Sequence, residues 1–356
     1  MPQRPAPACL IAAGGTAGHV LPALAVAEAL VARGAHVTFA GSPARIEARL
    51  VPEAGFEFDS FEVSGLPRRP GIALARALAQ DAGAVRACSR ILAARRPDVV
   101  LSAGGYVGGP MVLAAARRRI PAALLEADAH LGLANRLAAP LAQRVFLSFP
   151  IPGRAAGKYR VTGRPIPLRS RPVDRIDARR RFDLPPDGQV LLVFGGSQGA
   201  RRLNELAVDV FGADGPLVLH LAGARDFPQL RDRVDREGYR LLPFTDDFGA
   251  ALSAADLALA RAGGSVWELA GAGVPAVLVP YPHATADHQT RNAEHFVRGG
   301  GAVLMPEPEL ASVPDLVRSL LDDAARLEQM RAAMLRLARP GAADEIAEEV
   351  IALASA

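Results

Sequence analysis

Residues 257–280 read LALARAGGSVWELAGAGVPAVLVP, and this stretch decides the fold that we expect. Two short apolar runs, at 257–260 and 276–279, predict buried strands, and a helix that carries Glu268 separates them. The helix begins just after the Gly-Gly-Ser turn at 263–265, so its free backbone N–H groups and positive dipole end suit a phosphate. The Glu268 carboxylate can accept hydrogen bonds from the two hydroxyls of a ribose. The stretch therefore predicts a nucleotide-sugar site, although a helix dipole alone also favours a first-turn acid.

The chain is long enough for two hydrophobic cores. It has 356 residues, of which 50% are hydrophobic, whereas a single core rarely serves more than about 250–300 residues. No apolar run approaches the ~18–20 residues that span a bilayer, and the N-terminus does not resemble a secretory signal, so we expect a soluble cytoplasmic protein. The two cysteines, Cys9 and Cys88, fit neither a metal site nor a disulfide framework, and we expect both in the core.

Charge is distributed unevenly along the chain. The net charge is +4, but residues 1–160 carry 19 Lys plus Arg against 10 Asp plus Glu. The basic half is the candidate for an anionic partner or surface. A compositional preference for arginine explains the excess equally well, because Lys158 is the only lysine. We expect no nucleic-acid partner.

An internal repeat predicts two similar domains. Residues 10–19 (LIAAGGTAGH) recur as residues 191–200 (LLVFGGSQGA), each an apolar strand followed by Gly-Gly, a hydroxyl residue and a further glycine. Strands alternate with helical segments along the chain, which is typical of parallel sheets covered on both faces. The stretch 159–186, rich in Pro, Arg and Asp, is the predicted hinge region.

The glycine turns do not match two common nucleotide-binding classes. A dehydrogenase places an acid for the ribose roughly 20 residues after its glycine turn, but residues 40–42 here are Ala-Gly-Ser. None of the turns ends in the Gly-Lys-Ser/Thr of a P-loop, so ATP hydrolysis is not indicated.

Four glycine-rich motifs occur in the order found in one enzyme family. They are residues 14–22 (GGTAGHVLP), 104–110 (GGYVGGP), 195–201 (GGSQGAR) and 268–275 (ELAGAGVP). Together they resemble the peptidoglycan N-acetylglucosaminyltransferases of glycosyltransferase family 28, and the resemblance runs from residue 9 to about residue 305. It implies an α/β protein of the GT-B fold, with two Rossmann-like domains whose parallel sheets face each other across a cleft.

The resemblance also implies a reaction and domain roles. The implied reaction is transfer of GlcNAc from UDP-GlcNAc to the 4-hydroxyl of the MurNAc of lipid I, with inversion, which gives lipid II. No metal or other cofactor is implied. Residues 1–160 are expected to bind the acceptor and face the membrane, and residues 161–340 to bind UDP-GlcNAc. A C-terminal helix at 341–356 is expected to pack back on the first domain.

Carried over position by position, the resemblance assigns a donor site. It makes the second-domain glycine loop the diphosphate site, Thr245 the uracil contact and Glu268 the ribose ligand. The expected donor-binding residues are Gly195, Gly196, Ser197, Gln198, Arg164, Thr245, Gly264, Ser265, Glu268, His288 and Gln289. The chain departs from the family pattern at residues 163–167, where Gly-Arg-Pro-Ile-Pro stands for Gly-Asn-Pro-Val-Arg.

The resemblance assigns an acceptor side in the same way. The expected acceptor-binding residues are Gly14, Gly15, Thr16, Gly105, Tyr106 and Asn135. His19 is the expected catalytic base, because the ordinary pKa of histidine suits proton removal from a hydroxyl near neutral pH. A phosphate-binding His19, with Asp128 or Glu126 taking the proton, is the alternative. Residues 125–128 are Leu-Glu-Ala-Asp where the family has His-Glu-Gln-Asn, so a carboxylate replaces an amide.

Some of these residues have plainer interpretations. Glu126 and Asp128 form an acid-x-acid pattern that can bind metal, but a hydrogen-bonding role suits the acceptor side better. The turn at 104–109 could serve close packing alone. His283 and His295 lack metal-ligand spacing with any cysteine and suit loop bracing.

A basic segment predicts peripheral docking on the cytoplasmic face of the inner membrane. Arginine side chains would pair with anionic headgroups while nearby apolar side chains insert shallowly. The residues of this segment are Arg68, Arg69, Arg76 and Arg86, with Leu66 and Ile72 beside them.

Two other functions remain open at this point. One is a GT-B glycosyltransferase that acts on another lipid or on a small hydrophobic acceptor. The other is a UDP-GlcNAc 2-epimerase, which shares the two-domain architecture. An epimerase would convert UDP-GlcNAc alone to UDP-ManNAc, whereas a transferase would leave it unchanged.

Overall fold

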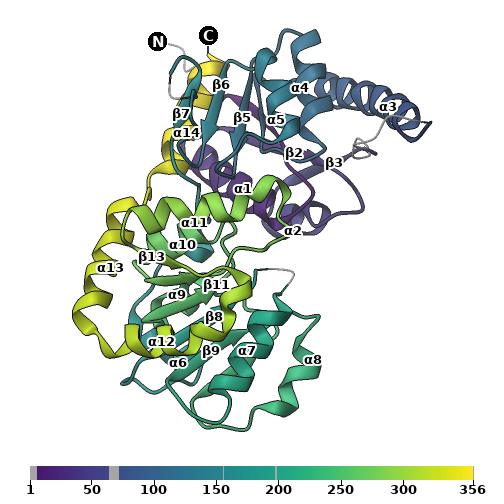
Figure 1. Cartoon of the computed structure of the whole chain (residues 1–356). Helices are drawn as coiled ribbons and strands as arrows, with labels where there is room; N and C mark the ends of the chain where they lie inside the picture. Colours follow the sequence, from purple (N-terminus) through teal and green to yellow (C-terminus); the bar gives the residue numbers. More distant parts are fainter. Residues whose placement is uncertain (1–5, 64–71, 155, 197–198, 356) are drawn as a thin grey trace. The chain divides into compact units, whose positions relative to one another are not determined.

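The computed structural model describes residues 6–63, 72–154, 156–196 and 199–355, with the side chains of 72–81 excepted. It divides into two compact units. The first unit consists of residues 1–167 and 340–356, and the second of residues 168–339 (Figure 1). The division after residue 167 lies seven positions beyond the predicted end of the first domain at residue 160. Residue 160 itself lies within β7, which pairs with the first sheet.

The first unit contains a seven-stranded sheet in which all neighbouring strands are parallel, in the order β3-β2-β1-β4-β5-β6-β7. Its strands are β1 (Ala8–Ala12), β2 (His36–Gly41), β3 (Glu57–Ser60), β4 (Val99–Ser102), β5 (Ala122–Glu126), β6 (Arg144–Leu147) and β7 (Tyr159–Val161). Its helices are α1 (Ala17–Ala32), α2 (Glu47–Glu53), α3 (Ile72–Arg95), α4 (Gly108–Arg117), α5 (Leu133–Ala138), the 3-10 helix η1 (Ala139–Leu141) and α14 (Ala342–Ala354).

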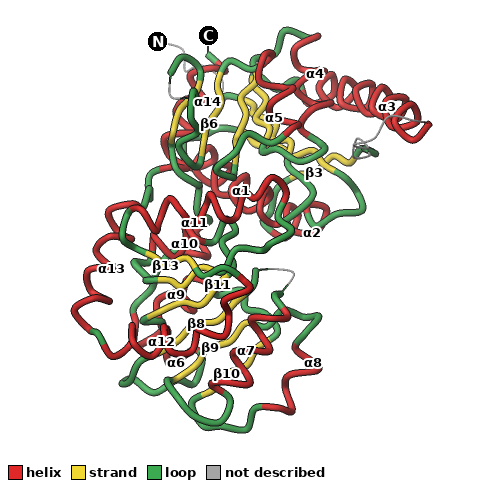
Figure 2. The backbone as a smooth tube through the Cα atoms, in the orientation of Figure 1, coloured by secondary structure: helices red, strands yellow, loops and turns green. Residues whose placement is uncertain are grey.

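The central strand β1 is buried on both faces because helices cover both sides of the sheet (Figure 2). Successive side chains of a strand point to opposite faces. Accordingly, Cys9 and Ile11 pack with α1 and α14, whereas Leu10 and Ala12 pack with α3 and α4. Burial raises the pKa of the Cys9 thiol to about 12. It does the same for Cys88, so both cysteines are core residues, as predicted.

The C-terminal helix α14 completes the first unit. Ile346 and Val350 on this helix are fully buried against the apolar face of α1. Arg33 at the end of α1 reinforces the contact, because its guanidinium donates to Asp344 at 2.7 Å and to Glu348 at 3.0 Å. The last residues of the chain therefore belong to the same core as the first strand.

The second unit repeats the design with a six-stranded parallel sheet in the order β10-β9-β8-β11-β12-β13. Its strands are β8 (Val190–Phe194), β9 (Leu217–Leu221), β10 (Tyr239–Leu242), β11 (Leu257–Ala260), β12 (Ala276–Leu278) and β13 (Ala302–Leu304). Its α-helices are α6 (Arg175–Arg181), α7 (Arg201–Phe211), α8 (Phe227–Leu230), α9 (Phe248–Ala254), α10 (Val266–Gly271), α11 (His288–Arg298), α12 (Val313–Asp322) and α13 (Ala324–Leu337). Its 3-10 helices are η2 (Leu168–Ser170), η3 (Arg231–Arg233), η4 (Thr285–Asp287) and η5 (Glu307–Ser312).

The predicted α/β class with two Rossmann-like domains is confirmed. The repeat aligns the turn between β1 and α1 with the turn between β8 and α7. In each unit the repeated strand lies inside the sheet, paired on both sides. Within the described ranges, no helix is long and apolar enough to cross a membrane.

Candidate active site

Two glycine turns of the first unit touch each other. They follow β1 and β4, which are neighbours in the sheet, so both turns lie beyond the same edge. Gly105 has φ +72°, and a Cβ built there would lie 2.3 Å from the carbonyl oxygen of Gly14. Only glycine satisfies both the backbone conformation and this close approach. The contact therefore fixes one predicted acceptor-binding turn against the other.

His19 lies beside the second of these turns. A Cβ built on Gly104 would be 3.2 Å from Cδ2 of His19 and 3.6 Å from Nδ2 of Asn135. On the other side of the ring, Nδ1 of His19 is 3.3 Å from Oγ1 of Thr16. The structure thus brings Thr16 and His19 together with Asn135, which is distant from them in the sequence.

Glu126 organises the loop that follows β5. It is only 4% exposed, and its carboxylate accepts hydrogen bonds from the backbone N–H of Asp128 (3.2 Å) and of Gly132 (2.9 Å). The side-chain amide of Asn135 donates to it as well, at 2.9 Å. Burial raises the pKa of Glu126, and the hydrogen bonds from Asn135 and Gly132 oppose this. Because three N–H donors occupy its oxygens, Glu126 braces the loop, whereas Asp128 is partly exposed.

Arg164 connects the start of α1 to the loop after β5. Its guanidinium is buried and donates to the carbonyl oxygens of Gly18 at 2.6 Å and of Ala127 at 3.4 Å. The sequence placed Arg164 among the donor-binding residues. In the structure it ties the first turn of α1, which carries His19, to the loop that follows Glu126.

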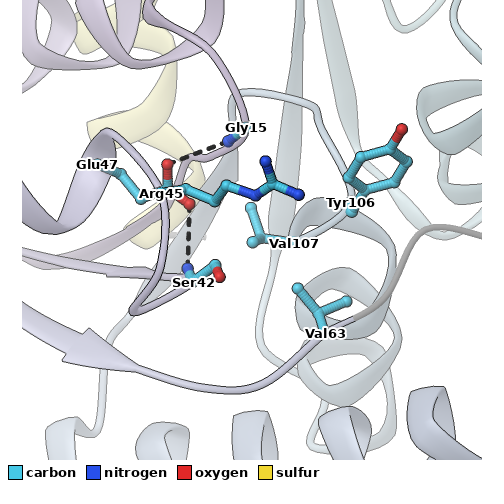
Figure 3. Close-up of a pocket in the computed structure, with 7 residues that line it drawn as sticks. All are labelled: Gly15, Ser42, Arg45, Glu47, Val63, Tyr106 and Val107. Atoms are coloured by element: carbon cyan, nitrogen blue, oxygen red, sulfur yellow. Dashed lines mark hydrogen bonds between the residues drawn. The ribbon is translucent and has the colours of Figure 1, made fainter.

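Glu47 supports the first glycine turn and was not predicted. Its side chain is fully buried, and its carboxylate accepts hydrogen bonds from the backbone N–H of Gly15 and of Ser42, both at 3.1 Å (Figure 3). A Cβ built on Gly14 would lie 2.5 Å from Oε1 of Glu47. The only local feature of the sequence that pointed to Glu47 is its place as an acidic residue in the first turn of α2. Beside it lies a pocket of about 290 Å³ lined by Gly15, Ser42, Arg45, Glu47, Val63, Tyr106 and Val107 (Figure 3).

In the second unit, the predicted donor turns follow the neighbouring strands β8 and β11. Gly196 has φ +81°, and the turn closes with a hydrogen bond from Gly199 N–H to Gly196 O at 2.9 Å. Ser197 and Gln198 lie outside the described residues. After β11, Gly264 leads to Ser265, which directly precedes α10. The predicted diphosphate loop and the start of α10 are therefore adjacent at the edge of one sheet.

The remaining predicted donor residues lie at helix starts and in one loop of this unit. Glu268 is partly exposed in the first turn of α10. Thr245 Oγ1 accepts from the backbone N–H of Asp247 at 3.1 Å, which shapes the turn before α9. His288 Nδ1 lies 2.9 Å from the carbonyl oxygen of Thr285. Gln289 Oε1 accepts from the backbone N–H of Tyr281 at 2.9 Å, which ties α11 to the loop after β12.

A buried polar chain lies within this unit. Asn204 donates through Nδ2 to Ala222 O (2.8 Å) and to Asp226 Oδ2 (3.0 Å), so its Oδ1 faces the ring of His220. Nε2 of His220 therefore carries the hydrogen and donates to that oxygen at 3.0 Å. The Tyr239 hydroxyl then donates to Nδ1 of His220 at 2.8 Å. Every polar atom of the His220 ring has a partner.

This buried polar chain supports the predicted diphosphate loop. A Cβ built on Gly199 would lie 2.7 Å from Ala222 O and 3.3 Å from Asp226 Oδ2, so the loop rests directly on the network. Asp226 is 2% exposed, and its Oδ1 pairs with Nε of Arg225 at 3.0 Å. The sequence pattern predicted the loop but none of its support.

Comparison with known proteins identifies the family. The model of the glycosyltransferase family 28 N-terminal domain matches residues 9–147, and that of its C-terminal domain matches residues 190–346. The chain belongs to glycosyltransferase family 28. It is accordingly a glycosyltransferase, and the predicted family is confirmed.

Relatives within family 28 match almost the whole chain. A protein of Halorhodospira halophila is 41% identical over 95% of this chain and 96% of its own length. One of Halothermothrix orenii is 35% identical over 92% and 94%. Both are named UDP-N-acetylglucosamine--N-acetylmuramyl-(pentapeptide) pyrophosphoryl-undecaprenol N-acetylglucosamine transferase.

Solved structures place this family 28 protein in the GT-B fold. The crystal structure of Acinetobacter baumannii MurG matches with a TM-score of 0.77 and 28% identity, covering 97% of this chain and 99% of that chain. A putative UDP-N-acetylglucosamine 2-epimerase from Listeria monocytogenes matches with a TM-score of 0.71 at 15% identity, over 96% and 95%. The second likeness concerns the fold alone, so the fold does not separate transferase from epimerase.

His220 leads us to expect a pH-dependent stability for the second unit of this family 28 protein. Burial lowers the pKa of His220 from 6.5 to about 3. Between these values the unfolded chain binds a proton that the folded chain excludes, so the free energy of unfolding falls as the pH is lowered. We expect a loss of about 2 kcal/mol from His220 between pH 7 and pH 5, measured by urea unfolding.

Two variants isolate this contribution. In His220→Gln, the contribution of about 2 kcal/mol to the change in unfolding free energy between pH 7 and pH 5 should be absent. His283→Gln, at an exposed position of the same unit, should keep this contribution. If wild type and His220→Gln lose the same free energy between pH 7 and pH 5, the assignment to His220 is wrong.

Proposed function

We propose that this protein transfers GlcNAc from UDP-GlcNAc to the 4-hydroxyl of the MurNAc of lipid I, with inversion, to give lipid II. The observation that carries the proposal is the match, over 92% of this chain or more, to relatives named for this transfer. The alternative of an epimerase is supported by likenesses in fold, at 14–15% identity. Transfer to another lipid acceptor remains the second candidate.

In this proposal the first unit activates the acceptor. His19 removes the proton from the 4-hydroxyl as that oxygen attacks the anomeric carbon of GlcNAc. With Nδ1–H donating to Thr16 Oγ1, the basic nitrogen is Nε2, 3.5 Å from the Cβ position of Gly104. The bond between the anomeric carbon and the diphosphate breaks on the opposite face, and its electron pair leaves with UDP.

The second unit stabilises the leaving group in this proposal. The backbone N–H groups of the Gly195-Gly196 loop and of the start of α10 suit the diphosphate, because helix N-termini bind anions. Glu268, in the first turn of α10, accepts from the ribose hydroxyls. His288 and Gln289 hydrogen-bond to the sugar, and the segment at Thr245 holds the uracil.

One assay tests the reaction class. UDP release from UDP-GlcNAc should require a short-chain lipid I analogue, and UDP-GlcNAc incubated alone should remain unchanged. Formation of UDP-ManNAc without an acceptor would establish an epimerase instead. Release with an unrelated lipid acceptor, but none with the lipid I analogue, would establish the second candidate.

We also propose that the first unit docks peripherally on the cytoplasmic face of the inner membrane. Of the basic segment, residues 64–71 and the side chains up to residue 81 lie outside the described residues, whereas Arg86 is exposed on α3. Helix α4, which packs on α3, ends at the exposed Arg117, and the exposed Arg118 and Arg119 follow it. Each basic residue near an anionic surface contributes about 1 kcal/mol.

Vesicle sedimentation tests this docking. Binding should increase with the anionic lipid content of the vesicles and decrease with ionic strength. Binding that responds to neither variable would contradict an electrostatic membrane surface.

A further inference from the structure

We infer that the pocket beside the first glycine turn binds an anionic oxygen group of the acceptor, a phosphate or a carboxylate, and that Arg45 supplies the positive charge. The inference rests on the proposed function, because it assigns the pocket to the acceptor of that reaction. All the residues that line the pocket belong to the first unit.

The first step concerns the charge already present in the pocket. Glycine turns before helices usually bind anions through their backbone N–H groups. Here the N–H of Gly15 already donates to the carboxylate of Glu47 at 3.1 Å. An anionic ligand beside Gly15 would therefore meet a buried carboxylate and would need a cation to offset the repulsion.

Arg45 is the cation in the right place. It lies in the loop between β2 and α2, just before Glu47, and its guanidinium extends across the pocket toward the side from which Tyr106 projects (Figure 3). Among the described residues, no carboxylate pairs with Arg45, and its side chain is exposed. Arg49 on α2 differs, because it donates to Glu53 at 3.1 Å.

The walls of the pocket suit an anion that is attached to a larger molecule. Val63 and Val107 form apolar surface, and the ring of Tyr106 is 60% exposed at the opposite side. A guanidinium presents parallel N–H donors to the two oxygens of a phosphate or carboxylate. The acceptor of the proposed reaction carries both groups, a diphosphate and the carboxylates of its peptide, and either has this chemistry.

Kinetics of Arg45→Gln test the inference. We expect the KM for a lipid I analogue to rise about tenfold or more, with kcat at saturation and the KM for UDP-GlcNAc unchanged, because the contact binds ground state and transition state alike. Arg45→Lys should recover part of the affinity, since it restores charge without the planar fork. The control Arg49→Gln should behave as wild type. If the KM of Arg45→Gln for the lipid I analogue equals that of the wild type, the inference is wrong.

Binding without the donor separates this inference from the proposed function. Calorimetric titration of the lipid I analogue into wild type and Arg45→Gln should show the same tenfold or greater loss, whether or not transfer occurs. Equal affinities would overturn the inference, while absence of transfer by the wild type would overturn only the proposed function.

An analogue with its peptide carboxylates amidated identifies the anion. If wild type still binds it about tenfold more tightly than Arg45→Gln does, the ligand of Arg45 is the diphosphate. If wild type and variant bind it equally, while still differing for the intact analogue, the ligand is a peptide carboxylate. Both results support the pocket, and an intact analogue that binds both proteins equally contradicts it.

Discussion

His19→Ala should lower kcat by about 10²–10⁴ and leave the affinity for UDP-GlcNAc nearly intact. An inverting transfer needs a base at the acceptor hydroxyl, and a base that acts only in the transition state affects kcat rather than binding. His19 lies at the second glycine turn with Thr16 on its other side. Steady-state kinetics with a lipid I analogue, together with UDP-GlcNAc titration, measure both quantities.

The exposed His36 of the same unit provides the matched control, and His36→Ala should leave kcat unchanged. A normal kcat in His19→Ala with a raised acceptor KM would mean that His19 binds phosphate. In that case Asp128→Asn should be the variant that loses turnover. The structure favours Asp128 over Glu126 for this role, because three N–H donors already occupy the Glu126 carboxylate.

Glu268→Ala should weaken UDP-GlcNAc binding by roughly ten- to a hundredfold. A carboxylate that accepts from two ribose hydroxyls makes charge-assisted hydrogen bonds worth about 1.5–3 kcal/mol. Glu268 has the position that this contact requires, partly exposed in the first turn of α10 and directly after the glycine turn of β11. Calorimetry with UDP and with UDP-GlcNAc measures the loss.

Glu268→Gln should lose less affinity than Glu268→Ala, since the amide oxygen can still accept a hydrogen bond from the ribose. If Glu268→Ala binds UDP as tightly as the wild type does, Glu268 is not the ribose ligand. Glu268 would then be only an acid that the dipole of α10 favours.

The sequence predicted the elements whose physical requirements are local. Strand β11 lies at residues 257–260 as expected, because a short apolar run between turn residues has few other ways to be buried. The turns at Gly105 and Gly196 were predictable because positive φ values and close backbone approach require glycine, which leaves a visible pattern. The repeat then extended the prediction from one unit to two.

The missed residues act over long separations in the chain. Glu47 bonds to Gly15 across 32 positions, and His220 bonds to Asn204 across 16, so neither makes a local pattern. Arg164 was assigned to the donor from its place in a motif, and the structure adds that its guanidinium donates to two backbone carbonyls of the first unit. A motif fixes where the backbone turns, but the partner of a long side chain depends on the tertiary fold.

The position of α14 has a consequence for how this protein can be divided. Cleavage between the units at residue 167 would not yield two complete folding units, because the last helix of the chain belongs to the first one. A fragment ending there would present the bare apolar face of α1 to water, and Arg33 would lose both of its carboxylate partners. Separate production of an acceptor-side domain therefore calls for a circular permutant, with α14 spliced ahead of β1, or for α14 supplied as a complementing peptide.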